Sequence, residues 1–150
     1  MREAIELAVE NVRAGRGGPF AAVIVRNGEV IARGTNTVTS TNDPTAHAEV
    51  NAIRAACRVL GDFQITDCEI YTSCEPCPMC LGAIYWARPR RVFYGATRED
   101  AAAVGFDDAM IYDEIDCSPD QRALPMEQLL REEAQAGFAA WREKPDRVDY

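Results

Sequence analysis

The chain has 150 residues, of which 47% are hydrophobic and 27% charged, as expected for one soluble domain with its own core. Its 16 Lys and Arg against 24 Asp and Glu give a formal net charge of −8, which argues against nucleic acid as the main partner. The first residues lack the apolar stretch of a secretory signal, and the longest apolar run, "PFAAVIV", is too short to span a membrane. We therefore expect a cytoplasmic protein with no membrane partner.

Hydrophobic spacing predicts an N-terminal helix followed by a β-hairpin. An amphipathic helix is expected over residues 3–14. The apolar positions that recur at helical spacing are Ile5, Ala8, Val9 and Val12. Two strands, "FAAVIVR" and "EVIARGTN", follow, and the Asn27-Gly28 pair between them predicts a two-residue turn.

The middle of the chain alternates between helices and strands. Residues 37–44 are expected to form a polar loop, after which Thr45 would cap a helix that runs to about Leu60. The buried face of that helix is expected to hold Val50, Ile53, Cys57 and Leu60. A strand over "CEIYTS", a helix from near Pro78 to about Ala87 and a strand over "RRVFYGA" come next.

The C-terminal third is less regular. "EDAAAVG" is expected to form a short helix, "DAMIYDEI" is ambiguous between helix and strand, and a final helix is expected over about 125–140. Strands that alternate with helices after an opening hairpin predict an α/β fold. We expect a three-layer α/β/α sandwich with a mixed five-stranded sheet, in a single domain over residues 1–150.

Three of the six cysteines crowd into "CEPCPMC", which in a cytosolic protein points to a metal rather than to disulfides. Cys77 and Cys80 would share one face at the start of a helix, where the helix dipole favours thiolates. His47, the only histidine, falls at the start of another predicted helix. One imidazole and two thiolates are a ligand set of catalytic zinc, which leaves a fourth position for a water of pKa about 7.

Glu49 lies two residues after His47, and it is the natural group for acid–base work because the only imidazole is used as a ligand. Other interpretations stay open on spacing alone. His-x-Glu can reflect a buried or capping histidine, and Cys-x-x-Cys can be a redox pair. Cys74 could join the three ligands in a closed structural zinc site.

Taken together, "HAE" and "PCPMC" match the H-x-E and P-C-x-x-C signature of zinc-dependent nucleobase deaminases. The sequence resembles the cytidine deaminase-like superfamily from "GGPFAAVIV" through "TSCEPCPMCLGAIYWARP" to "VFYGA". The resemblance implies one Zn²⁺ per subunit, with its water, on His47, Cys77 and Cys80. It also implies that Glu49 is the proton shuttle and that Cys74 is not a ligand.

Within that superfamily the chain is most similar to the small bacterial guanine deaminases, through "GTNTVTSTNDPTAHAE", "AVGFDDAMIY" and a terminal tyrosine. Ala21 is a departure, since glycine is common there. The resemblance implies that Asn36, Ala48 and Asp108 contact the base and that Asp108 assists catalysis. It also implies a homodimer in which a C-terminal segment of about 120–150 is swapped, so that Tyr150 reaches the partner's site.

Phe20 or Trp86 could stack on a purine ring, although both are at least equally suited to a core. Asp108 could instead cap a helix, and a terminal Tyr150 could be frayed. The expected activity is hydrolysis of guanine to xanthine and ammonia. The alternatives are deamination of tRNA adenosine, deamination of a nucleoside, and a non-catalytic module that zinc stabilises.

Overall fold

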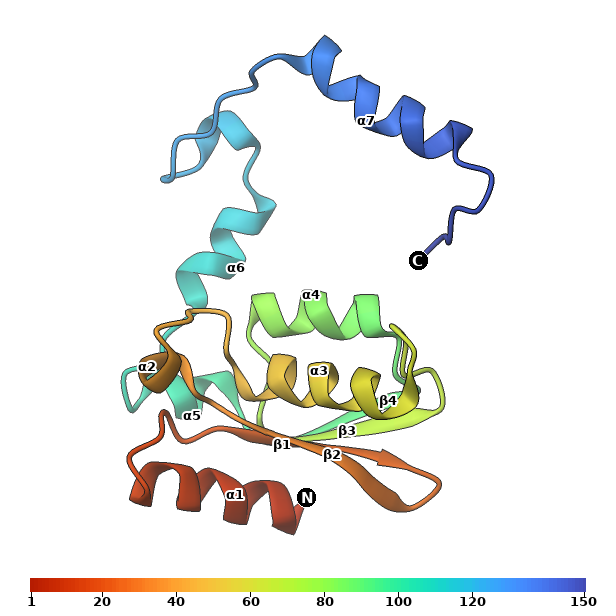
Figure 1. Cartoon of the computed structure of the whole chain (residues 1–150). Coiled ribbons are helices and arrows are strands. Elements are labelled where there is room, and N and C mark those ends of the chain that lie inside the picture. The colour runs from red at the N-terminus through yellow and green to blue at the C-terminus, as the bar shows by residue number, and fades with distance from the viewer. The chain divides into compact units, whose positions relative to one another are not determined.

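The computed structural model describes all of residues 1–150 (Figure 1). Its elements in chain order are α1 (Arg2–Arg13), β1 (Ala21–Arg26), β2 (Glu29–Thr35), α2 (Val38–Thr41), α3 (Ala48–Leu60), β3 (Cys68–Cys74), α4 (Pro78–Ala87), β4 (Arg91–Ala96), α5 (Arg98–Ala102), α6 (Ala109–Asp116), the 3₁₀ helix η1 (Pro119–Gln121) and α7 (Arg131–Glu143). Their contacts divide the chain into two compact units, Met1–Asp108 and Ala109–Tyr150. None of the helices has the length and apolar character needed to cross a membrane.

The first unit contains a mixed sheet in the order β2-β1-β3-β4. β1 is antiparallel to both β2 and β3, whereas β3 and β4 are parallel. The predicted hairpin turn is confirmed, with Asn27 and Gly28 at φ values of 51° and 83°. The expected fifth strand is not confirmed, since the sheet has four strands. Most of "DAMIYDEI" instead lies in helix α6, in which Ile111 and Ile115 share a face.

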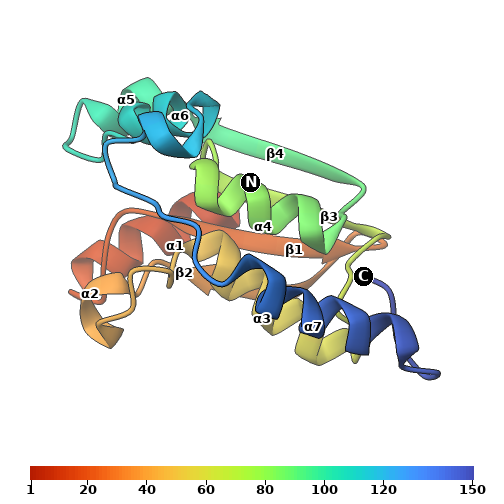
Figure 2. The ribbon, with the colours of Figure 1, turned by 90° about the horizontal axis from the view of Figure 1, so that it is seen from above.

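Helices cover both faces of this sheet, as the predicted three layers require. Figure 1 shows α1 on one face and α3 and α4 on the other, and Figure 2 shows α3 and α4 side by side. The largest fully buried side chains of the core include Ile24, Ile65 and Ile70. The mixed sheet therefore holds the N-terminal ends of α3 and α4 on one face.

The buried faces of α1 and α3 differ from the sequence prediction, because small residues face the sheet in both. In α1 the buried residues are Ala4, Ala8 and Asn11, whereas Ile5, Val9 and Val12 are 43–50% exposed. In α3 the buried apolar residues are Ala48, Ala52 and Ala56, and the larger Val50, Ile53, Cys57 and Leu60 are only partly buried. Small side chains let a helix lie close to a sheet, and larger ones then flank the contact.

Gly34 on β2 shows how close α3 lies to the sheet. A Cβ atom at Gly34 would lie 2.2 Å from the carbonyl oxygen of Ala48 and 2.4 Å from the nitrogen of Ala52. The two backbones are therefore in direct contact, and only glycine fits at this point of β2. This contact fixes the first turn of α3 against the sheet.

The segment ahead of α3 also differs from the prediction, since its polar loop contains the single-turn helix α2. Thr45 does not cap α3, which begins at Ala48 with His47 in the N-cap position. The Oδ1 atom of Asp43 accepts hydrogen bonds from the N–H (2.8 Å) and the hydroxyl (2.7 Å) of Thr45. Because Asp43 holds this hydroxyl, it does not reach the first N–H groups of α3.

The second unit consists of α6, η1, α7 and their connections. No side chain of α6 or α7 is buried. The final helix was predicted over about 125–140 and instead begins at Arg131. Leu130, its N-cap residue, has a left-handed φ of 50°, a conformation that interrupts a right-handed helix.

Candidate metal centre and active site

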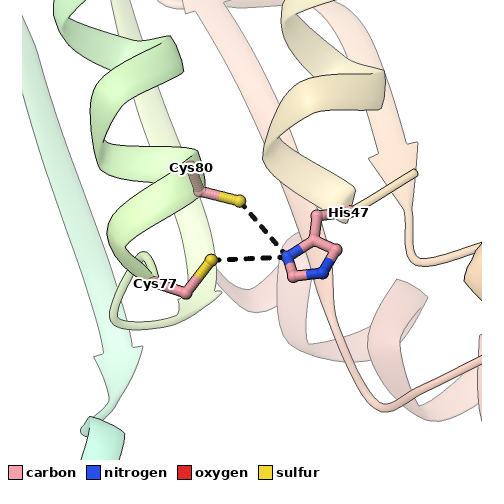
Figure 3. Close-up of side chains that lie close together, drawn as sticks. All are labelled: His47, Cys77 and Cys80. Carbon is pink, nitrogen blue, oxygen red and sulfur yellow. Dashed lines mark hydrogen bonds between the residues drawn. The ribbon is translucent and has the colours of Figure 1, made fainter. Parts of the chain in front are cut away.

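Three potential metal ligands meet at the N-terminal ends of two helices. His47 is the N-cap residue of α3, Cys77 is the N-cap residue of α4, and Cys80 lies in the first turn of α4. The Nδ1 atom of His47 lies 3.5 Å from the Sγ of Cys77 and 3.4 Å from the Sγ of Cys80 (Figure 3). All three ligand atoms lie within 4.8 Å of one another, which suits a small cation bound between them.

The local sequence explains why both N-cap side chains face this point. Neither His47 nor Cys77 makes the side-chain hydrogen bond of a usual cap, and both have extended backbone angles. Pro78 fits the first position of α4, where no backbone N–H is needed. Both side chains therefore project ahead of a helix N-terminus, where the helix dipole favours negative charge on the thiols.

The electrostatics of the three groups fit a cation site. Hydrogen bonds from Cys80 and then His47 hold the pKa of the Cys77 thiol well below its usual range. The hydrogen bond between Cys80 and Cys77 raises the pKa of the Cys80 thiol, and the hydrogen bond between His47 and Cys77 raises the pKa of the His47 ring. The three groups thus stabilise a thiolate even before a metal binds, and a metal bound by both thiols would displace the remaining proton.

Cys74 lies outside this cluster although it begins the "CEPCPMC" motif. Its thiol is buried and donates a hydrogen bond to the carbonyl oxygen of Thr97 at 3.5 Å. Burial, followed by the nearby charge of Glu49, raises the pKa of Cys74 to about 11. The Cys74 thiol is turned to this carbonyl, and only His47, Cys77 and Cys80 bring their ligand atoms close enough together to share a metal ion.

Glu49 is the buried carboxyl group of the site, with only 5% of the residue exposed. Its Oε1 accepts a hydrogen bond from the Thr72 hydroxyl at 2.8 Å, and its Oε2 accepts one from the Cys80 thiol at 3.4 Å. Burial raises the pKa of Glu49, and the bond from Thr72 opposes that shift. One carboxylate oxygen therefore faces the metal ligands while the other is fixed by β3.

Sequence reasoning did not identify Thr72. Alternate residues of β3 are buried, from Cys68 to Cys74, which places the Thr72 side chain on the inner face. A polar residue on the inward register of a strand needs a hydrogen-bond partner, and this was the available signal. That the partner is Glu49, 23 residues earlier in the chain, depends on the fold.

Asn36 lies at the end of β2 and is only 6% exposed. Its Oδ1 accepts hydrogen bonds from the backbone N–H groups of Gly18 and Val38, both at 3.3 Å. These two bonds fix the orientation of the side-chain amide. They leave the Nδ2 group as the part of Asn36 that can donate to a ligand.

Phe20 and Asp108 lie on neighbouring segments of the first unit. The Phe20 ring packs partly against the core and edge-to-face against Phe106, with centroids 4.9 Å apart. Asp108 is half-buried, and its pKa is raised first by burial and then by negative charge on Cys77. The role of Asp108 in base binding and catalysis stays a prediction.

The remaining predicted site residues fall in three different places. Ala48 is fully buried between His47 and Glu49, in the first turn of α3. Trp86 is near the C-terminal end of α4, six residues beyond Cys80, and is 64% exposed. Tyr150 belongs to the second unit. Stacking of Trp86 or Tyr150 on a base stays a prediction.

Comparisons with known proteins agree with this geometry. The family described as "Cytidine and deoxycytidylate deaminase zinc-binding region" matches residues 1–96, a range that includes all three metal ligands. The chain is 57% identical to the guanine deaminase of Bacillus subtilis over 150 residues, which are 100% of this chain and 96% of that protein. It is 46% identical to a tRNA-specific adenosine deaminase of Agrobacterium fabrum over 86 residues, 57% of each chain.

A solved structure extends the similarity to the whole fold. The X-ray structure of guanine deaminase from Bacillus subtilis is 58% identical and superposes with a TM-score of 0.97. The match covers 99% of this chain and 95% of that one. The similarity thus includes the second unit as well as the sheet.

Proposed function

The chain belongs to the family of zinc-binding cytidine and deoxycytidylate deaminases, and we propose that it hydrolyses guanine to xanthine and ammonia. The observation that carries this proposal is the buried Glu49 carboxyl, held beside three zinc ligands. A structural zinc site has no use for a buried acid, whose burial costs free energy. Full-length similarity to a guanine deaminase supports guanine as the substrate.

His47, Cys77 and Cys80 would hold the zinc, which would lower the pKa of a water molecule and so supply a nucleophile at neutral pH. Glu49 accepts a proton from that water and delivers it to N3 of guanine as the oxygen adds to C2. The proton of the added hydroxyl group then moves to the amino nitrogen, the bond from C2 to that nitrogen breaks, and ammonia leaves while C2 becomes the carbonyl carbon of xanthine. Asp108 holds the leaving amino group and assists this last proton transfer.

Recognition of the base draws on a side-chain amide, a carboxylate and a backbone N–H from separate segments of the chain. The Nδ2 group of Asn36 donates to an acceptor on the guanine edge, and Asp108 accepts from its N–H donors. The N–H of Ala48 lies in the first turn of α3, where backbone donors have no partner inside the helix. The exposed part of the Phe20 ring supplies an apolar surface for the purine.

We further propose a cytoplasmic homodimer in which the C-terminal segment is exchanged and Tyr150 completes the partner's site. Neither α6 nor α7 buries a side chain, although both have an apolar face. The second unit, with 42 residues, is too short to form an adequate core of its own. A second copy of the chain would provide the surface that these helices need.

Glu49→Gln tests the reaction while preserving the size of the side chain. We expect zinc content and binding of xanthine to be retained, and kcat for guanine to fall by about 10²- to 10⁴-fold. Glu69→Gln, on β3 and bonded to Tyr71 and Arg90 rather than to the metal ligands, is the matched control and should leave kcat unchanged. Unchanged ammonia release from guanine by Glu49→Gln would exclude the proposed role.

The substrate is tested by measuring ammonia release from guanine, adenine, cytosine, their nucleosides and a tRNA stem-loop. Guanine should give the highest kcat/KM. A preference for the stem-loop would favour the alternative of a tRNA adenosine deaminase, which the net charge of −8 disfavours. A preference for a nucleoside would instead place a ribose in the site.

A further inference from the structure

Asn11 is a fully buried polar residue on α1, outside the metal centre. Its Nδ2 group donates to the carbonyl oxygens of Gly18 at 2.9 Å and of Asn36 at 2.8 Å. Its Oδ1 accepts from the Arg16 Nε at 3.4 Å, which fixes the orientation of the amide. One buried side chain thus joins α1, the loop after it and the end of β2.

The loop and β2 are in close contact where Asn11 joins them. A Cβ atom at Gly17 would lie 2.1 Å from the carbonyl oxygen of Asn36 and 3.0 Å from its Oδ1. The next residue, Gly18, donates its N–H to that Oδ1 at 3.3 Å. The backbone N–H of Asn36 in turn donates to the carbonyl oxygen of Phe20 at 3.0 Å. The loop therefore contacts both the backbone and the side chain of Asn36.

We infer that Asn11 is a positioning residue for substrate recognition, which keeps the Asn36 amide turned so that it donates to the base. This inference rests on the proposed function, in which Asn36 binds guanine. Asn11 holds Gly18 against β2, and Gly18 occupies the Oδ1 of Asn36. Without Asn11 the loop loses this support, and Val38 alone then holds the Oδ1 of Asn36. The less constrained amide can rotate to present an acceptor where the purine also has one. The result is weaker binding of guanine.

The reaction centre has separate support. Asn51 on α3 donates from Nδ2 to the carbonyl oxygens of Thr35 at 2.9 Å and Ala46 at 3.3 Å. These bonds tie the end of β2 and the residue before His47 to α3 from the other face of the sheet. None of them involves Asn11. Loss of Asn11 should therefore weaken substrate binding without releasing zinc or moving Glu49.

The experiment compares Asn11→Leu, which keeps the size of the side chain but removes its donors, with the wild-type protein. We expect KM for guanine and the dissociation constant of xanthine to rise about tenfold, corresponding to about 1.4 kcal/mol, with kcat and zinc content within about twofold. Ala8→Gly is the matched control, because it weakens the buried face of α1 without touching Gly18 or Asn36. Its KM should stay unchanged.

Gly17→Ala tests the same contact if Asn11→Leu does not fold. Its methyl group would push the Asn36 carbonyl from the loop side, and we expect the same rise in KM with kcat preserved. Unchanged KM in the folded variants, or a fall in kcat with KM constant, would overturn the inference. A zinc-loaded wild-type protein that releases no ammonia from guanine would instead reject the proposed function, and with it the inference.

Discussion

The Thr72 hydroxyl is the contact that fixes the direction of the Glu49 carboxylate. Thr72 is fully buried, and its bond to Oε1 leaves Oε2 for the metal side. Bonds to charged groups typically contribute about 1.5–3 kcal/mol, so their loss at a reacting group has large effects on rate. In the proposed reaction, Thr72 therefore acts on catalysis through Glu49.

Thr72→Val removes this bond with little change in volume. We expect kcat for guanine to fall about 10- to 100-fold, with KM and zinc content unchanged, because Glu49 loses its fixed orientation. Thr72→Ser restores the hydroxyl and should recover most of the rate. Steady-state kinetics and metal analysis of both variants measure this. Equal rates for the valine and serine variants would show that the hydroxyl has no such role.

At the scale of residues, the sequence predicted the groups whose roles depend on short spacings. His47 and Glu49 are two residues apart, and Cys77 and Cys80 share one helix turn, so local geometry already brings each pair together. The supporting residues Thr72 and Asn11 could not be predicted. Their partners lie 23 and 25 residues away, and only the packing of strands and helices brings them together.

At the scale of elements, the contact between β2 and α3 places the zinc ligand and the acid. Gly34→Ala would bring a methyl group against the backbone of α3. We expect a loss of about 1–3 kcal/mol in the free energy of unfolding, together with a lower kcat because α3 carries His47 and Glu49. Urea unfolding and kinetics test this. Gly82→Ala on α4 is the control, since its Cβ meets nothing within 4 Å.

The turn that precedes α3 gives a pH dependence of known sign. The hydroxyl of Thr45 and then its N–H lower the pKa of Asp43, so folding favours the charged carboxylate. The stabilisation of the folded state by this carboxylate is present above its pKa in the unfolded chain, about 3.9, and is lost as the pH falls through its lower pKa in the folded protein. The turn should therefore weaken in acid.

Asp43→Asn isolates this contribution. We expect the urea midpoint of the zinc-free wild-type protein to exceed that of the variant by a small, constant amount above about pH 5, and the difference to shrink below about pH 4. The effect is small because Asp43 is near the surface. A difference that grows as the pH falls would contradict the assigned sign.

Elements marked by a strong hydrophobic periodicity or by a specific turn sequence were predicted well, and features that depend on packing were not. The β-hairpin followed from Asn27-Gly28, and α4 from Pro78. The exposed positions of Ile5, Val9 and Val12 were missed because the side chains that face the sheet are small, and hydrophobic spacing marks only the larger ones. The start of α7 was missed because it depends on one left-handed residue, Leu130.

At the scale of the whole molecule, the proposed exchange of C-terminal segments can be tested by complementation. A Glu49→Gln protein and a protein that lacks Tyr150 should each be nearly inactive. Unfolded together and refolded at equal amounts, they should recover about a quarter of the wild-type activity, because half of the dimers are mixed and one site in each is intact. Recovery of no activity would place Tyr150 in its own subunit's site.

The three-layer arrangement was predicted from the order of strands and helices, but the division of the chain into two units was not. The division falls between Asp108 and Ala109, directly after a predicted catalytic residue. No glycine- or proline-rich linker marks it in the sequence. The boundary follows from where long-range contacts stop, which a single sequence does not record.

The two supports of the site have a consequence for how this protein can change. The bonds of Asn11 and the contact at Gly17 come from α1 and its loop, whereas Thr72 and the zinc ligands belong to β3, α3 and α4. In the proposed site, substitutions in α1 and its loop are therefore expected to change binding of the base through Asn36 more than they change the hydrolytic chemistry. A library confined to that N-terminal segment, selected for deamination of heterocycles other than guanine, would test this expectation.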